Sequence, residues 1–273
     1  MSSQTNANTL NPTCGFQAGV EDRPHAPKVV VVSLASCFGC QLQITNIESH
    51  LLDLLGQIDL GYWQLTSDVP LPEAFDVAVI EGAVTTEQAE RQVKRVRDIA
   101  KYVITVGACA VTGGIPGMAA DGFFERPSQV YEKIPAACGS MVKPRPVSNV
   151  IDVDFEVRCC PIDPLDFVAV LQRVLYGSNR LPQTKTLCGE CKRNETGCFY
   201  EDGTLCMGMI TSGGCGARCV NLGRPCMGCA GLSADANLDA ARMVAAAKGV
   251  PVEAFNARLE IFNQTNPALN PYQ

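Results

Sequence analysis

Histidine is almost absent from this chain of 273 residues, which contains only two. Zinc and haem sites that use imidazole ligands therefore have almost nothing to draw on. Long apolar runs are absent as well, because no stretch reaches the ~18 residues that a membrane-spanning helix needs. Lysine and arginine (22) are outnumbered by aspartate and glutamate (28). This balance argues against nucleic-acid binding, which depends on cations that neutralise phosphates.

The first 27 residues lack the apolar core of a signal peptide and a twin-arginine pair. We expect residues 1–27 to form a flexible or partner-wrapping arm, on a chain that stays in the cytoplasm.

Cysteine, by contrast, is abundant, with 15 residues. In a secreted chain of under a hundred residues such a number indicates disulfides, but the cytosol keeps thiols reduced. Metal binding is therefore the better interpretation here. With so little histidine, ligation by thiolates alone favours iron–sulfur clusters.

Residues 28–177 alternate short apolar segments with amphipathic ones, which predicts a parallel, doubly wound α/β sheet of the flavodoxin-like kind. We expect Asp163 or its neighbour to cap a helix that ends before Gly177. Strands are expected within 28–36, 57–65, 75–82, 102–110 and 150–161, and helices over 41–56, 85–101 and 163–177.

Residues 178–273 have a different character. Apolar periodicity disappears between 178 and 231, and eight cysteines occur within 42 residues. We expect that this segment cannot build an ordinary core and that inorganic clusters supply its internal scaffold. Helices are expected over 237–249 and 251–262, so the region is predicted to be a small two-cluster iron–sulfur module with C-terminal helices.

Four cysteines follow three different strands of the predicted sheet: Cys37, Cys40, Cys109 and Cys160. Parallel strands deliver their carboxyl ends to one edge, so these thiols should converge there, with Glu81 beside them. Four thiols are the ligand count of a 4Fe–4S cluster. A thioredoxin-like dithiol at Cys37 and Cys40 is the alternative, but it leaves the other two cysteines unused.

The later cysteines suffice for two further tetrathiolate sites. They are Cys188, Cys191, Cys198, Cys206, Cys215, Cys219, Cys226 and Cys229. Two structural zinc ions are the alternative, since four-cysteine zinc sites also use CxxC pairs. Zinc would not explain the separate thiols at the sheet edge.

Several stretches resemble the small, electron-transferring subunit of NiFe hydrogenases, in particular the cytoplasmic sulfhydrogenase delta or NAD(P)-linked type. They are "SCFGCQLQ", "IEGAVTTEQ", "VGACAVTGGI", "CCP" before a helix, and "LCGECKRNETGC" with "LCMGMITSGGCGARCVNLGRPCMGC". The resemblance covers residues 28–262.

This resemblance implies three 4Fe–4S clusters. The proximal cluster would take Cys37, Cys40, Cys109 and Cys160, the medial cluster Cys215, Cys219, Cys226 and Cys229, and the distal cluster Cys188, Cys191, Cys198 and Cys206. Electrons would pass between the NiFe centre of a separate large subunit and iron–sulfur and flavin-containing subunits that use FAD and NAD(P). The alternative is a small subunit of the heterodisulfide reductase-associated, methyl-viologen-reducing type.

The chain departs from the family pattern in places. Cys159 replaces the usual Gly before the proximal Cys-Pro, and Ile162 replaces the second Pro. Cys159 could compete with Cys160 as proximal ligand, and we favour Cys160 because it directly precedes Pro161. Leu42 replaces a Glu found in many relatives. The small subunit of respiratory complex I shares the sheet, but it lacks the module of eight cysteines.

Overall fold

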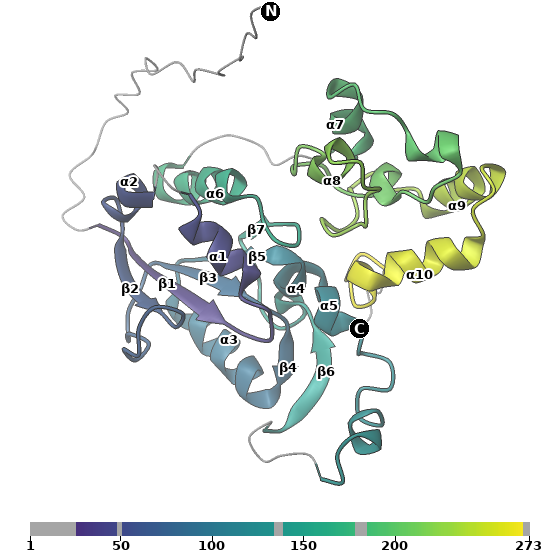
Figure 1. The fold of residues 1–273 in the computed structure, drawn as a ribbon. Coiled ribbons are helices and arrows are strands. Elements are labelled where there is room, and N and C mark those ends of the chain that lie inside the picture. The colour runs from purple at the N-terminus through teal and green to yellow at the C-terminus, as the bar shows by residue number, and fades with distance from the viewer. Residues whose placement is uncertain (1–25, 48–50, 134–138, 178–184, 270–273) are drawn as a thin grey trace, which may run out of the picture.

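The computed structural model describes residues 26–47, 51–133, 139–177 and 185–269, and its centre is a parallel sheet (Figure 1). The five strands are β1 (Lys28–Ser33), β2 (Asp59–Trp63), β3 (Val77–Glu81), β5 (Tyr102–Val106) and β7 (Phe155–Val157). They lie in the order β2-β1-β3-β5-β7, and every neighbouring pair is parallel. This is the flavodoxin-like order, so the predicted fold class is confirmed.

Successive residues of the strands pack into two different apolar layers, because side chains alternate across a strand. Val31 and Val79 lie on the face covered by α1 (Gly39–Thr45), α2 (Leu51–Leu55) and α6 (Pro164–Tyr176). Val30 and Ile80 lie on the opposite face, under α3 (Glu87–Ile99). Helices on both faces explain why these strands read as continuous apolar runs in the sequence.

The predicted helix boundaries are confirmed at α6. The carboxylate of Asp163 accepts hydrogen bonds from the backbone N–H groups of Leu165 and Asp166, and Gly177 ends the helix at a φ of 67°. The expected helix over 41–56 differs from the structure: α1 ends at Thr45, a turn follows, and α2 starts at Leu51.

Two further features differ from expectation. Residues 107–110 are not part of a strand but begin α4 (Gly107–Thr112), which α5 (Gly114–Gly117) follows. Residues 84–86 form β4 (Val84–Thr86), which pairs antiparallel with β6 (Met141–Arg145). Neither of these short strands was predicted. Short 3-10 helices cover Pro127–Gln129 and Val147–Asn149.

The cysteine-rich region contains mostly short helices. They are α7 (Cys188–Arg193), α8 (Arg218–Asn221), α9 (Leu238–Ala247) and α10 (Val252–Asn263), with 3-10 turns at Phe199–Asp202 and Met207–Met209. The expectation that this region lacks an ordinary core was wrong in one respect. Leu187, Met207 and Ile210 are buried together with Phe255 and Leu259 of α10. The core of this region therefore combines apolar side chains of the C-terminal helices with buried cysteines. No helix in the described ranges has the length and apolarity to cross a membrane.

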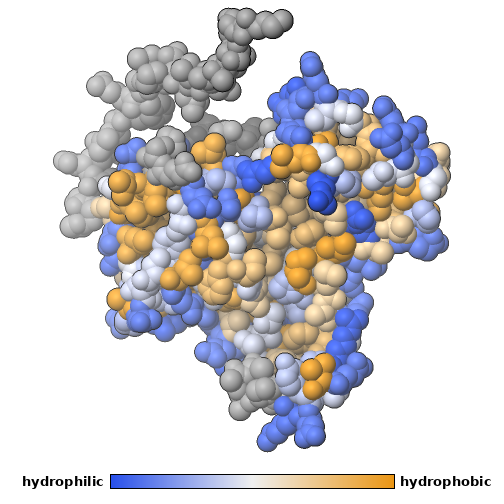
Figure 2. Space-filling model, viewed as in Figure 1, coloured by the Kyte–Doolittle hydropathy of each residue, from blue (hydrophilic) through white to orange (hydrophobic). Residues whose placement is uncertain are grey.

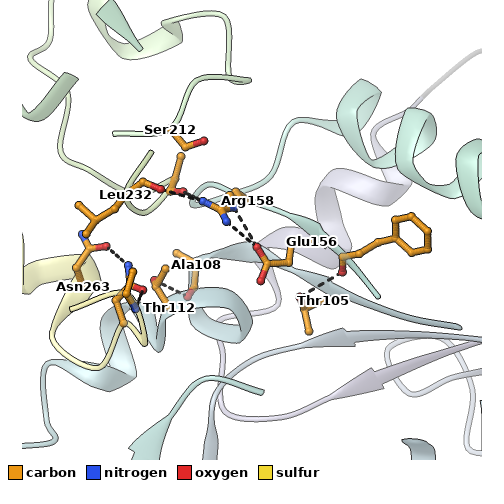
Figure 3. A network of polar contacts seen from close by, with 12 residues as sticks. Thr105, Ala108, Thr112, Glu156, Arg158, Ser212, Leu232 and Asn263 are labelled. Atoms are coloured by element: carbon orange, nitrogen blue, oxygen red, sulfur yellow. Dashed lines mark hydrogen bonds and ion pairs between the residues drawn. The ribbon is translucent and has the colours of Figure 1, made fainter. Parts of the chain in front are cut away.

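The cysteine-rich region is joined to the sheet by polar contacts at the end of β7 (Figure 3). The Arg158 guanidinium makes two bonds to the Glu156 carboxylate, at 2.9 and 3.1 Å. It also donates to the backbone carbonyls of Ala230 and Leu232. In α4, the Thr112 hydroxyl donates to the carbonyl of Phe262 at 2.6 Å. These bonds fix the loop after Cys229 against the loop that holds Cys160.

Replacing Arg158 with Gln should loosen this junction. Hydrogen bonds that involve a charged group contribute about 1.5–3 kcal/mol each, and the variant loses the charged donor. We therefore expect a lower thermal unfolding midpoint in circular dichroism.

Arg242→Gln is the matched control, since Arg242 bonds only to Asp239 and Asn256 within the α9 and α10 region. An equal decrease in both variants would contradict a specific role for Arg158.

Candidate iron–sulfur sites

The structure brings the four cysteines of the sheet edge together. Cys37 and Cys40 lie at the turn into α1, Cys109 lies in α4, and Cys160 follows β7. The charges of Cys109 and Cys160 act on Cys40, and that of Cys37 acts on both Cys109 and Cys160. The predicted convergence of these thiols at the carboxyl ends of the strands is therefore present in the fold. Cys37 and Cys160 are exposed, whereas Cys40 is buried.

A buried polar network holds the CxxC turn in place. Glu81 ends β3 and accepts a hydrogen bond from the Cys40 backbone N–H at 3.1 Å. Its second oxygen accepts from the Gln41 side-chain amide at 2.6 Å. The Gln41 carbonyl oxygen in turn accepts from the Trp63 indole N–H at 2.6 Å. Glu81 and Gln41 are almost fully buried, so their polar groups bond to protein groups instead of water. These hydrogen bonds fix the start of α1.

Glycine is required where α4 begins. Gly107 has a φ of 83°, which L side chains rarely adopt, and a Cβ there would overlap the Sγ of Cys40. The backbone of α4 thus approaches the proximal thiols closely. The N–H of Ala108 donates to the carbonyl of Cys159 at 2.8 Å, which ties α4 to the loop after β7.

Burial and crowding raise the pKa values of these thiols. Burial is the main cause that raises the pKa of Cys109 to about 11, with the charges of Cys37 and Glu81 adding to it. Burial, followed by the charge of Cys109, raises the pKa of Cys160 to about 12. The pKa of Cys40 is raised further, again mainly by burial. Four thiolates can share this edge only with a compensating positive charge, which bound iron supplies.

A second group of thiols lies around α7. The charges of Cys206, Cys191 and Cys198 act on Cys188, and burial, as the main cause, raises the pKa of Cys188 to about 11. Cys206 accepts a hydrogen bond on its Sγ from the backbone N–H of Cys226 at 3.2 Å. All four cysteines expected in the distal set therefore lie close together.

The third group holds the cysteines expected in the medial set. The charges of Cys215 and Cys229 raise the pKa of Cys219, and the charge of Cys229 also raises that of Cys226, with burial as the main cause in each case. The Sγ of Cys226 accepts from the Gly228 N–H at 3.4 Å. Backbone N–H groups that point at sulfur are typical of iron–sulfur surroundings, where they stabilise negative charge on the cluster.

Cys159 is buried next to Cys160. Interactions with the thiols of Cys215 and Cys229, followed by burial, raise the pKa of Cys159. The same contact is the main cause that lowers the pKa of Cys215 to about 6, and it also lowers the pKa of Cys229. The sequence pattern revealed an extra cysteine here but gave no sign that it faces the later cysteines.

The chemistry of the donor sets fits iron–sulfur clusters. Within the described ranges, no three His, Cys, Asp or Glu side chains come close enough together to hold one metal ion. Tetrathiolate sets, N–H donors to sulfur and glycine at the closest approach are all features of iron–sulfur surroundings.

One supporting residue was missed by sequence reasoning. Glu190 in α7 is buried and accepts hydrogen bonds from the N–H groups of Gly214 at 2.6 Å and Ala217 at 3.1 Å. It thereby holds the loop of Cys215 against the helix of Cys188 and Cys191. The sequence shows that Glu190 lies between Cys188 and Cys191. Its hydrogen-bond donors, Gly214 and Ala217, lie more than 20 residues further along the chain, so no local pattern pointed to them.

Comparison with known families gives the identity of the fold. The family model described as the NADH ubiquinone oxidoreductase 20 Kd subunit matches residues 37–174, half of the chain. The chain belongs to this family. The match includes all four cysteines at the sheet edge and ends before the cysteine-rich region.

The relatives that cover the rest of the chain are hydrogenase subunits. A subunit of the F420-non-reducing hydrogenase of Methanocaldococcus jannaschii is 31% identical, over 86% of this chain and 91% of its own length. The sulfhydrogenase 2 subunit delta of Pyrococcus furiosus is 31% identical, over 77% of this chain and 89% of its own length. The predicted kinship with hydrogenase small subunits is therefore confirmed, and the chain is an oxidoreductase subunit.

A solved structure supports the fold. A chain of an NAD+-reducing [NiFe]-hydrogenase in the H2-reduced state matches with a TM-score of 0.54 and 24% identity. The match covers 58% of this chain and 96% of that one. At this identity the likeness confirms the fold alone.

Glu81→Ala should destabilise the protein strongly. The change removes the acceptor of the Cys40 N–H and one of the two acceptors of the Gln41 amide, which keeps its bond to the Ser33 hydroxyl, and each unsatisfied buried group costs about 1–3 kcal/mol. We expect a lower free energy of unfolding in urea.

Glu87→Ala is the control for this variant, because the Glu87 side chain makes an exposed ion pair with Arg91 in α3 and lies away from the CxxC turn. Exposed pairs contribute at most about 1 kcal/mol. Equal stability of the two variants would show that the Glu81 network does not hold the CxxC turn.

Proposed function

We propose that the chain is the electron-transfer small subunit of a NiFe hydrogenase, which relays electrons through three 4Fe–4S clusters. The observation that supports this most directly is the order of the three thiol groups. Cys160 of the sheet-edge group lies near Cys229 of the medial group, and Cys215 of the medial group lies near Cys191 of the group around α7. The groups thus form a series from the sheet edge to α7, as a relay requires.

The proposed ligands follow these groups. The proximal set is Cys37, Cys40, Cys109 and Cys160, the medial set is Cys215, Cys219, Cys226 and Cys229, and the distal set is Cys188, Cys191, Cys198 and Cys206. The clusters, when bound, would accept and pass on single electrons. The protein positions the thiolates, excludes water from Cys40, Cys206 and Cys226, and directs N–H groups at sulfur.

The large subunit is proposed to dock at the sheet edge. Leu42, Ile115 and Met118, from α1 and the α5 region, are exposed although they are large and apolar. Figure 2 shows apolar residues gathered across the middle of this face, between the sheet and the cysteine-rich region. An exposed apolar area beside the exposed Cys37 and Cys160 suits a partner that covers the proximal cluster.

The domain boundaries and the location of the chain are part of the same proposal. Residues 28–177 would form the flavodoxin-like domain and 178–273 the iron–sulfur module, with 1–27 as an arm. The arm lies outside the described residues. A cytoplasmic location agrees with the many free thiols, because the cytosol keeps cysteines reduced.

The electron acceptor is proposed to be a flavin and NAD(P)-linked subunit. One relative is the NAD-reducing hydrogenase HoxS subunit delta of Cupriavidus necator, 28% identical over 55% of this chain. The methyl-viologen-reducing, heterodisulfide reductase-associated type is the second candidate. A subunit of an F420-non-reducing hydrogenase matches over 86% of this chain, so a type that does not use NAD(P) is kept as this second candidate. Supplying hydrogen to the purified native complex, and measuring reduction of NADP or of a disulfide, separates the two.

Cys219→Ser tests the relay itself. Cys219 lies in the middle group, so its loss should degrade the medial cluster and reduce hydrogen-driven reduction of the acceptor to a small fraction. Hydrogen–deuterium exchange at the large subunit needs no relay and should remain near the wild-type rate.

Leu222→Ser is the control, since it changes an exposed residue just after α8 without removing a thiol. Equal loss of exchange and acceptor reduction in Cys219→Ser would contradict the relay and indicate a general folding defect.

A further inference from the structure

The end of α10 forms a buried polar junction with α4, the helix that carries Cys109. The chain returns here from the cysteine-rich region, and α10 ends beside α5 (Figure 1). The Thr265 hydroxyl donates to the carbonyl of Thr112 at 3.2 Å, and the Thr112 hydroxyl donates to the carbonyl of Phe262 at 2.6 Å. Thr112 is the last residue of α4, so these two bonds join the end of α10 to the end of that helix.

Two glycines make the space that Thr265 occupies. A Cβ on Gly113 would overlap the Oγ1 of Thr265, and a Cβ on Gly117 would lie 2.7 Å from the same atom. Thr265 is 4% exposed, so its hydroxyl has left water and bonds to the protein instead. The turn after α10 is therefore fitted closely against α4 and α5.

The same turn also touches the loop between two of the medial cysteines. The side-chain amide of Asn263 donates to the carbonyl of Gly228 at 3.5 Å, and Gly228 lies between Cys226 and Cys229. Asn266 donates to the Asn263 side-chain oxygen at 2.8 Å, which orients that amide. One short segment thus contacts both the helix of Cys109 and the loop of the later cysteines.

The polar character of this junction indicates what it does. Polar groups are costly to bury unless they are hydrogen-bonded, and an apolar junction would avoid that cost. A fully bonded buried network, however, fixes one arrangement of the segments that it joins. Asn263, Thr265 and Asn266 are all buried, and each donates a side-chain hydrogen bond.

We propose that the turn over residues 263–266 is a spacer, which fixes Cys109 relative to the loop of Cys226 and Cys229. The inference rests on the proposed function, in which these cysteines hold the proximal and medial clusters. Electron transfer between two centres slows steeply as their separation grows, so a fixed separation keeps this step fast. Arg158 joins the loop of Cys160 to the later segment, whereas this turn joins the helix of Cys109 to it. Thr265 is a positioning residue, because it acts through α4.

The test inserts a methyl group beneath Thr265 in the native complex. Gly117 lies in α5 and has no left-handed φ, so Gly117→Ala does not strain the backbone, but its Cβ would press on the Thr265 hydroxyl. Gly117→Ala combined with Thr265→Ala removes that oxygen and keeps the bond from Thr112 to Phe262. Gly56→Ala, after α2, is the control, since its Cβ would make an ordinary contact of 3.4 Å with the Leu52 carbonyl.

The spin–spin interaction between the reduced proximal and medial clusters is measured by electron paramagnetic resonance, together with iron per complex and hydrogen-driven reduction of the acceptor. We expect a weaker interaction and several-fold slower reduction in Gly117→Ala, with wild-type iron and wild-type hydrogen–deuterium exchange. The double variant should recover both properties, and Gly56→Ala should match the wild type.

An unchanged spin–spin interaction in Gly117→Ala would overturn the inference and leave the relay intact. Loss of iron in Gly117→Ala, or no recovery in the double variant, would overturn it as well, because the damage would then not act through Thr265. Absence of clusters from the wild-type complex would instead overturn the proposed function and this inference together.

Discussion

The close approach of the loop after β7 to the loop after Cys229 is the contact on which the arrangement of the cysteines depends. Arg158 bridges the two by bonding to Glu156 on one side and to the carbonyls of Ala230 and Leu232 on the other. Without this junction, the thiols of the sheet edge and those of the later segment would be two unrelated sets. With it, Cys160 and Cys229 become neighbours, and the three groups form one series.

Burial gives the thiols their chemical character. Removing the thiols of Cys40 and Cys109 from water raises their pKa values, and the charges of neighbouring groups raise them further. Free thiolates are unfavourable at these positions, because they lose hydration and repel one another. Bound iron compensates for both effects, so a cluster is favourable there. The same reasoning explains the N–H groups directed at Cys206 and Cys226 and the mixed core of the cysteine-rich region, in which α10 packs against cysteines and Met207.

Much of this could be predicted from the sequence because the relevant signals are local. Apolar runs ending at Cys37, Glu81, Cys109 and Cys160 located the strands and the edge at which they end. The break between α1 and α2, the β4 and β6 pair and the helical start at Gly107 were missed, because tertiary contacts decide them. The direction of the Cys159 thiol and the partners of Glu190 also depend on segments that are far apart in the chain, so no local pattern could show them.

The central claim is that twelve thiols bind three inorganic clusters. Analysis of iron, acid-labile sulfide and zinc in the chain purified without oxygen tests it most directly. Three 4Fe–4S clusters correspond to about twelve irons and about twelve sulfides per chain. Stoichiometric zinc without sulfide would contradict the account, because tetrathiolate zinc is colourless, carries no electrons and needs no sulfide.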